Sequence, residues 1–138
     1  MRKEFVSLTF DDLRAANLKR LPLFKNSRGE VAHSEADGSD WSNGEWLTAV
    51  CGELGELANL VKKVRRGDFT IEEARADLAK ELADVQIYLD ILAFRLGVDL
   101  GQATVEKFNE VSRRVGVDVK LGYRCGSVAT DDSDTAEG

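Results

Sequence analysis

The sequence predicts an all-α protein built from four helices. The composition favours helices: there is one proline, aromatic residues are few, and alanine, leucine, glutamate, lysine and arginine are frequent. In two long segments the apolar residues recur every three or four positions, the period of a helix with a buried face. A capping box of the form Ser/Thr-x-x-Glu begins each of these segments. We therefore expect a four-helix bundle with a long N-terminal loop and a disordered C-terminal tail.

Length and composition are those of one soluble globular domain. The chain has 138 residues, of which 43% are apolar and 32% are charged. We assign residues 1–125 to this domain and residues 126–138 to the tail. The net charge is −6, and the tail contributes four acids and no base: Asp131, Asp132, Asp134 and Glu137. Such an acidic balance argues against binding to polymeric nucleic acid.

The sequence carries no sign of a membrane or secreted protein. No apolar run is long enough for a membrane span, and no signal peptide is recognisable. The two cysteines, Cys51 and Cys125, match no metal-binding or redox spacing, so we interpret them as ordinary thiols in a reducing compartment. These features predict a cytoplasmic protein without a membrane partner.

The first helix is expected at residues 10–21. Thr9 can cap its N-terminus, acids occupy its first turn, and Pro22 limits its length. A polar loop follows at residues 24–41. A loop of this length in a small domain is more often functional or mobile than idle.

Three further helices are expected after the loop. The capping boxes at residues 42–45 and 70–73 begin the two longest helices, which end near Gly67 and Gly97. The fourth helix should cover residues 100–114. Its expected cap is Asp99 and its stop is Gly116. We expect residues 120–123 to form a short extended piece.

Both long helices carry apolar stripes. In the second helix the core-facing stripe comprises Trp46, Val50, Leu54, Leu57, Val61 and Val64. In the third helix one stripe comprises Leu78, Leu82, Val85, Leu89, Leu92 and Leu96. A second stripe lies on roughly the opposite side and comprises Ala83, Ile87, Ile91 and Phe94. A helix that is apolar on two sides is buried on two sides, so we expect this second face to meet another subunit.

Two acid-x-x-acid steps lie within these long helices. They are Glu53 with Glu56, and Glu81 with Asp84. Residues three apart share one face of a helix, so each step presents two carboxylates that repel each other. Two such pairs beside core stripes favour a site for a hard cation with oxygen ligands, which is typical of Mg²⁺ or Mn²⁺.

Residue types exclude most other metal or catalytic sites. A di-iron bundle needs Glu-x-x-His steps, and the single histidine, His33, lies in the loop. The sequence offers neither the histidine ligands nor the paired cysteine ligands of a zinc site. The sequence also lacks the glycine patterns of P-loop and Rossmann sites and the nucleophile elbow of serine hydrolases.

A magnesium cluster on helices implies a phosphate-bearing substrate. In proteins Mg²⁺ typically binds a few carboxylates together with substrate phosphates. Basic and polar residues should then lie nearby, and the candidates are Lys62, Lys63, Arg66, Lys107, Asn109, Arg113 and Arg114. The charges at the helix C-termini equally suit the negative ends of the helix dipoles.

Three segments carry a resemblance to a known family. They read WLTAVCGELGELANLVKK at 46–63, ELADVQIY at 81–88 and KFNEVSRR at 107–114. This pattern resembles the MazG-like family, all-α nucleoside triphosphate pyrophosphohydrolases whose metal signature is Glu-x-x-Glu followed by Glu-x-x-Asp. The resemblance extends over about residues 9–116. The small single-domain form is similar to phage and bacterial members, which implies the cytoplasm of a bacterium or of a phage-infected cell.

The resemblance implies roles for individual residues. Mg²⁺, for which Mn²⁺ can substitute, would be bound by Glu53, Glu56, Glu81 and Asp84. Phosphates or sugar would be contacted by Lys62 or Lys63, Tyr88, Lys107, Asn109 and Arg113. The base would lie near Asn17, His33, Trp41 and Trp46. We expect Glu53 and Glu81 to be the more fixed ligands, since they border the apolar stripes. Glu56 and Asp84 should lie further round, toward the cleft.

The expected reaction is hydrolysis of a nucleoside triphosphate to the monophosphate and pyrophosphate, by attack of water at the α-phosphorus. Deoxynucleotides are favoured, and a purine such as dGTP is a guess. The alternatives are a non-catalytic helical module for nucleotide binding or oligomerisation, and a pyrophosphohydrolase of another substrate such as phosphoribosyl-ATP. The family implies a homodimer or homotetramer. Any of the glutamates can be the general base, and the number of metal ions is open.

Overall fold

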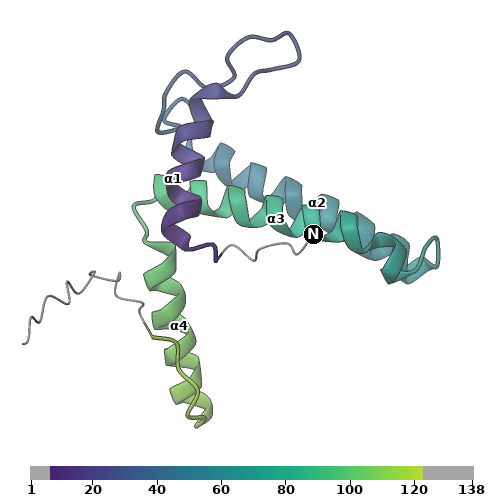
Figure 1. Ribbon diagram of the computed structural model, residues 1–138, viewed down its shortest axis with the longest axis vertical. Helices are drawn as coiled ribbons and strands as arrows, with labels where there is room; N and C mark the ends of the chain where they lie inside the picture. The colour runs from purple at the N-terminus through teal and green to yellow at the C-terminus, as the bar shows by residue number, and fades with distance from the viewer. Residues whose placement is uncertain (1–6, 123–138) are drawn as a thin grey trace, which may run out of the picture. The chain divides into compact units, whose positions relative to one another are not determined.

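A computed structural model describes residues 7–122 of the chain and confirms the all-α class (Figure 1). The helices are α1 (Phe10–Arg20), α2 (Asn43–Arg66), α3 (Ile71–Arg95) and α4 (Leu100–Val115). A short 3₁₀ helix, η1 (Leu21–Leu23), follows α1. The expected tail at 126–138 and the end of the expected extended piece at 120–123 lie outside the described residues.

The chain divides into two compact units, Met1–Gly101 and Gln102–Gly138. In the first unit α2 and α3 form a hairpin of two long helices that run side by side (Figure 1). Helix α1 packs against α3. The second unit contains nearly all of α4. There the side chain of Asn109 accepts from the backbone N–H of Leu121 at 2.8 Å and donates to its carbonyl at 2.9 Å.

The helix starts are set by local hydrogen bonds, as the sequence predicted. Thr9, Ser42 and Thr70 each accept a hydrogen bond from the backbone N–H three residues later, and the acid at that position bonds back to the cap. Left-handed glycines follow α2, α3 and α4, since a residue without Cβ adopts this backbone conformation at low cost. In α1 the last predicted residue instead begins η1.

The core lies where α2, α3 and η1 meet. It comprises Leu21, Trp46, Val50, Ile91 and Leu92. Partly buried rings cover it, those of Phe24, Trp41 and Tyr88.

The predicted apolar stripes were wrong in part, because five of their residues are exposed: Leu54, Val61, Leu82, Ala83 and Leu96. A repeat of three and four residues selects about half the circumference of a helix, and the facing helix covers only part of it. These apolar residues therefore remain accessible to solvent.

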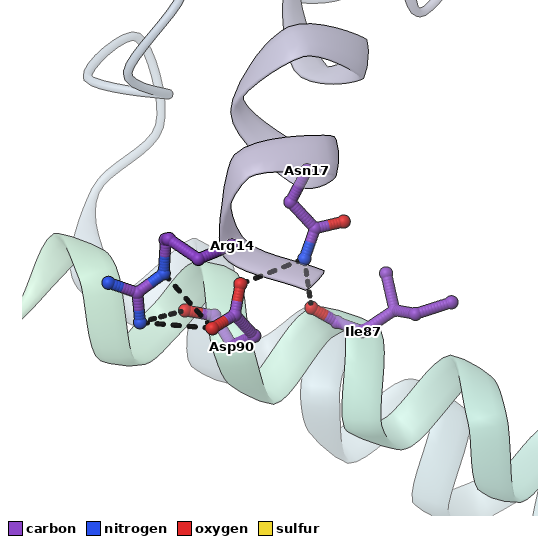
Figure 2. A network of polar contacts seen from close by, with 4 residues as sticks. All are labelled: Arg14, Asn17, Ile87 and Asp90. Carbon is purple, nitrogen blue, oxygen red and sulfur yellow. Dashed lines mark hydrogen bonds and ion pairs between the residues drawn. The ribbon is translucent and has the colours of Figure 1, made fainter. Parts of the chain in front are cut away.

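The second face of α3 is partly covered by the chain's own first helix. Asn17 of α1 donates to the carbonyl of Ile87, and Arg14 lies over the ring of Phe94 at 5.3 Å. Figure 2 shows both α1 side chains reaching the same stretch of α3. This stretch, which we expected to meet another subunit, already has a neighbour within the chain.

The loop between η1 and α2 folds over the core. An isolated bridge joins Lys25 and Val31, and the indole Nε1 of Trp46 donates to the carbonyl of Gly38 at 3.0 Å. Gly38 has a φ of 71° and is buried against Trp46 and Leu21. The loop is therefore a packed part of the first unit.

Gly38→Ala is expected to destabilise the protein by about 1–3 kcal/mol. An added Cβ would lie 2.9 Å from both Leu21 Cδ2 and Trp46 Cζ2, and the positive φ disfavours alanine. The free energy of unfolding from urea denaturation measures this effect. Gly29→Ala is the matched control, since it has a similar φ of 79° but nothing within 4 Å of the added Cβ. Equal losses in the two variants would contradict the close packing at Gly38.

Candidate functional site

Three of the four predicted acids come together between α2 and α3. Carboxylate oxygens of Glu53, Glu81 and Asp84 all lie within 4.8 Å of one another. All three side chains are half-buried, whereas Glu56 is exposed beside them. Asp84 was expected further round the helix, but it has the same intermediate burial as Glu53 and Glu81. The two acid-x-x-acid steps thus meet across the helix pair.

The electrostatics of this cluster are unfavourable without a cation. Burial raises the pKa of Glu53, and the charges of Asp84, Glu56 and Glu81 raise it further. Burial likewise raises the pKa of Glu81, together with Glu56 and Asp84. One carboxylate oxygen of Glu81 is buried and has no hydrogen-bond partner among the described residues. Clustered, partly buried carboxylate oxygens are a donor set that fits Mg²⁺ or Mn²⁺.

Mg²⁺ should stabilise the folded protein more at about pH 8 than at about pH 5. Because the pKa values of Glu53 and Glu81 are raised, the folded state keeps protons that the unfolded state releases. The metal-free protein therefore loses stability as the pH rises from the ordinary glutamate value through the raised values, and a bound cation offsets that loss. At a hundredfold excess over Kd the gain is about 2.7 kcal/mol.

Thermal melts at both pH values, with and without excess MgCl₂, measure this difference. KCl at equal ionic strength is the control for simple screening of charge. If MgCl₂ and KCl shift Tm equally, or if the Mg²⁺ shift is larger at the lower pH, the cluster does not bind the cation as its electrostatics imply.

Tyr88 connects the acid cluster with the aromatic core. Its ring centroid lies 6.3 Å from that of Trp46. Burial raises the pKa of its phenol, with further contributions from the charges of Glu53 and Asp84, while Arg20 lowers it. The phenol therefore stays a hydrogen-bond donor at neutral pH, close to both sets of residues.

Three of the four predicted base-binding residues lie in one aromatic cluster. The ring centroids of His33 and Trp41, and those of Trp41 and Trp46, are 4.7 Å apart, and His33 stacks on Trp46 at 5.3 Å. His33 and Trp46 are 5% and 1% exposed, so Trp41, which is half-buried, presents the accessible ring. The Nδ1 atom of His33 lies 3.4 Å from a carboxylate oxygen of Asp40.

A cavity of about 340 Å³, largely open to solvent, lies beside Trp41. It is lined by Trp41, Glu45, Thr48 and Ala49. The last three were not predicted as site residues, although Ala49, four residues before Glu53, lies on the same side of α2 one turn earlier. Hydrogen bonds from the Ser42 backbone and side chain hold the pKa of Glu45 low, so its carboxylate stays ionised.

The other predicted contacts have different surroundings. Asn17 is 3% exposed, and its amide donates to Asp90 and Ile87 rather than facing the cavity. Lys62 and Lys63 are exposed on α2, and the ammonium group of Lys62 donates to the side chain of Asn59.

The predicted phosphate contacts on α4 belong to the second unit. Lys107 pairs with Glu110 at 2.6 Å, Asn109 is bonded to Leu121, and Arg113 is exposed. For these residues the contact with phosphate stays a prediction.

No helix among residues 7–122 is long and apolar enough to cross a membrane.

Comparison with known proteins identifies relatives that match about half of the chain. The chain is 39% identical to dCTP pyrophosphatase 1 of Mus musculus over 83 residues, which are 57% of this chain and 49% of that protein. This part of the chain is therefore similar to a protein named dCTP pyrophosphatase 1. It is also 42% identical to the human dCTP pyrophosphatase 1 over 72 residues, which cover 49% of this chain and 42% of the human protein.

A phage protein shows the same similarity. The Gene 37 protein of Mycobacterium phage L5 is 42% identical over 67 residues, which cover 47% of this chain and 59% of the phage protein. These matches confirm the resemblance to the MazG-like family. The chain spans about half the length of the curated relatives it matches. No protein-family profile and no solved structure matches the chain.

Proposed function

We propose that the protein is a divalent-metal-dependent nucleoside triphosphate pyrophosphohydrolase. The observation that carries this proposal is the cluster of Glu53, Glu81 and Asp84, whose oxygens converge within 4.8 Å on the helix pair. The name of the mammalian relatives supports pyrophosphate release as the reaction. The bound metal would neutralise phosphate charge and activate water.

The protein residues then have distinct tasks. Glu53, Glu81 and Asp84 hold Mg²⁺, with Glu56 as the exposed fourth acid. A carboxylate of the cluster orients the attacking water and accepts its proton. The water oxygen bonds to the α-phosphorus, the bond from that phosphorus to the oxygen bridging to the β-phosphate breaks, and pyrophosphate leaves. Tyr88 is placed to donate a hydrogen bond at the edge of the cluster.

The cavity beside Trp41 supplies a site for the base. An accessible indole provides a stacking surface that suits any base. The ionised Glu45 carboxylate can only accept hydrogen bonds, so it suits a base that offers a donor such as an exocyclic amine. dCTP meets this condition and agrees with the name of the mammalian relatives. dGTP, the purine guessed from the sequence, meets it as well.

A substrate panel with Mg²⁺ or Mn²⁺ tests the proposal. It contains the ribo- and deoxyribonucleoside triphosphates and phosphoribosyl-ATP, and both pyrophosphate and orthophosphate are measured. We expect pyrophosphate from one or more nucleoside triphosphates. Orthophosphate alone would place the attack at another phosphorus. Turnover of phosphoribosyl-ATP alone would change the substrate class, and no turnover at all would favour the non-catalytic module.

We also propose that the chain forms a homodimer through the exposed face of α2. Five exposed residues along α2, spaced alternately four and three positions apart, form an apolar seam: Leu47, Cys51, Leu54, Ala58 and Val61. This spacing is that of helices packed against other helices. An antiparallel second copy centred on Leu54 pairs large residues with large and small with small, as a twofold interface requires.

Leu54→Glu is expected to convert the dimer to a monomer of 15.2 kDa. The substitution places two like charges at the centre of the interface, where an unpaired buried charge is costly. Size-exclusion chromatography with light scattering measures the mass. Leu8→Glu is the control, since Leu8 is 67% exposed and lies outside the seam. A parent protein that is monomeric, or a Leu54→Glu variant of unchanged dimeric mass, would contradict this interface.

A further inference from the structure

The first helix is tied to α3 through one buried carboxylate. Asp90 is 1% exposed, and both of its oxygens are occupied. Arg14 donates from Nε to Oδ1 at 3.0 Å and its Nη2 lies 3.0 Å from the same oxygen, while the amide of Asn17 donates to Oδ2 at 2.9 Å (Figure 2). A buried charge persists only when it is paired and hydrogen-bonded. The buried charge of Asp90 is therefore compensated only when α1 occupies its observed position.

The same two side chains also bind the backbone of α3. Arg14 donates to the carbonyl of Asp90 at 3.3 Å, and Asn17 donates to the carbonyl of Ile87 at 3.3 Å. Among the residues of α1 only Asn17 is buried. This helix is thus docked by directional polar bonds far more than by an apolar stripe. Directional bonds fix a position and a rotation, whereas apolar contact is non-directional.

Helix α1 leads directly into the aromatic cluster. Arg20, at its C-terminal end, lies over the ring of Phe24 at 5.4 Å and influences the pKa of Tyr88. Leu21 follows and is fully buried in the core with Trp46. The ring of Phe24 in turn meets His33 edge-on, with centroids 6.0 Å apart. The position of α1 is therefore coupled to the aromatic cluster, of which Trp41 lines the cavity.

On α3 the network adjoins the acid cluster. Ile87 and Asp90 lie about one and two turns after Asp84, and Tyr88 lies between them. This segment thus carries a cluster acid at one end and the anchor of α1 at the other. We propose that Arg14, Asn17 and Asp90 are positioning residues that fix the base-binding aromatic cluster relative to the acid cluster.

This inference rests on the proposed function, because it assigns the two clusters to one substrate. The decisive variant combines Arg14→Met with Asp90→Leu. Apolar residues that replace both partners of a buried ion pair often preserve or raise stability, whereas removing one partner leaves a charge unpaired. The double variant thus separates positioning from folding, and the single variant Asp90→Asn shows the effect of losing the charge alone.

For the double variant we expect KM of the nucleotide to rise at least about tenfold while kcat changes less than about twofold, because the substrate base is held less well and the acid cluster is intact. The Mg²⁺ dependence should match the parent protein. Both tryptophans of the chain lie in the aromatic cluster, so their fluorescence should show greater quenching by acrylamide. Far-UV circular dichroism and Tm check that the variant is folded.

Asp77→Asn is the matched control for Asp90→Asn. Asp77 is on the same helix and makes an ion pair with Lys80, but its side chain is 61% exposed. This control should leave KM and quenching unchanged. If the parent protein is fully active and the folded double variant has the same KM and the same quenching as the parent, the proposal is overturned. If the parent protein turns over no nucleotide, the proposed function fails, and unchanged quenching in the folded variant would still refute the positioning of the rings.

Discussion

Glu53→Gln is expected to reduce pyrophosphate release at least about 100-fold while the protein stays folded. Loss of an outer partner of a metal ligand already costs about 10–100-fold, and Glu53 lies in the cluster itself. Since Glu53 is repelled by its neighbours and its pKa is raised, removing its charge should not lower the stability of the metal-free protein. Initial rates with the best substrate, together with thermal melts, measure both effects.

Glu72→Gln is the control for this charge change. Glu72 lies in the first turn of α3, its side chain is 71% exposed, and its ion pair with Arg75 is a surface contact. Its activity should equal that of the parent protein. Glu81→Gln and Asp84→Asn should behave like Glu53→Gln. Substantial activity in any of these three folded variants would show that the cluster is not the catalytic centre.

Trp46→Ala is expected to lower the free energy of unfolding by about 3–5 kcal/mol. The indole is 1% exposed at the centre of the core, and it donates to the carbonyl of Gly38. Removing it leaves a cavity among Val50, Ile91 and the loop, and one carbonyl loses its donor. Urea denaturation measures the loss, with the slope m as a check on two-state unfolding.

Trp46→Phe separates the two contributions. Phenylalanine keeps most of the ring but cannot donate to Gly38, so the expected loss is smaller, on the order of 1–3 kcal/mol. A Trp46→Ala variant whose stability is within about 0.5 kcal/mol of the parent would contradict the position of this side chain in the core.

The helices were predictable because their ends are determined by residues that are close together in the sequence. Each capping box involves residues three apart, and each left-handed glycine is identified by its own lack of Cβ. The convergence of Glu53, Glu81 and Asp84 was predictable as well, since two repulsive pairs on long helices favour a shared cation site. These features depend on short stretches of sequence.

Long-range partners were not predictable in the same way. Asn17 was assigned to the base, but its partner Asp90 lies 73 residues away, and nothing near Asn17 in sequence indicates it. Leu54 and Val61 were assigned to the core, because periodicity alone does not tell which part of a broad stripe the next helix covers. Glu45 was recognised as a cap, and that role concealed its place beside the cavity.

Hydrolysis in ¹⁸O-labelled water tests the central claim most directly. The substrate that releases most pyrophosphate in the panel is hydrolysed with Mg²⁺, and the products are separated and analysed by ³¹P NMR and mass spectrometry. Attack at the α-phosphorus predicts that the label enters the nucleoside monophosphate and that the pyrophosphate is unlabelled. Label in the pyrophosphate, or labelled orthophosphate with a nucleoside diphosphate, would contradict the account.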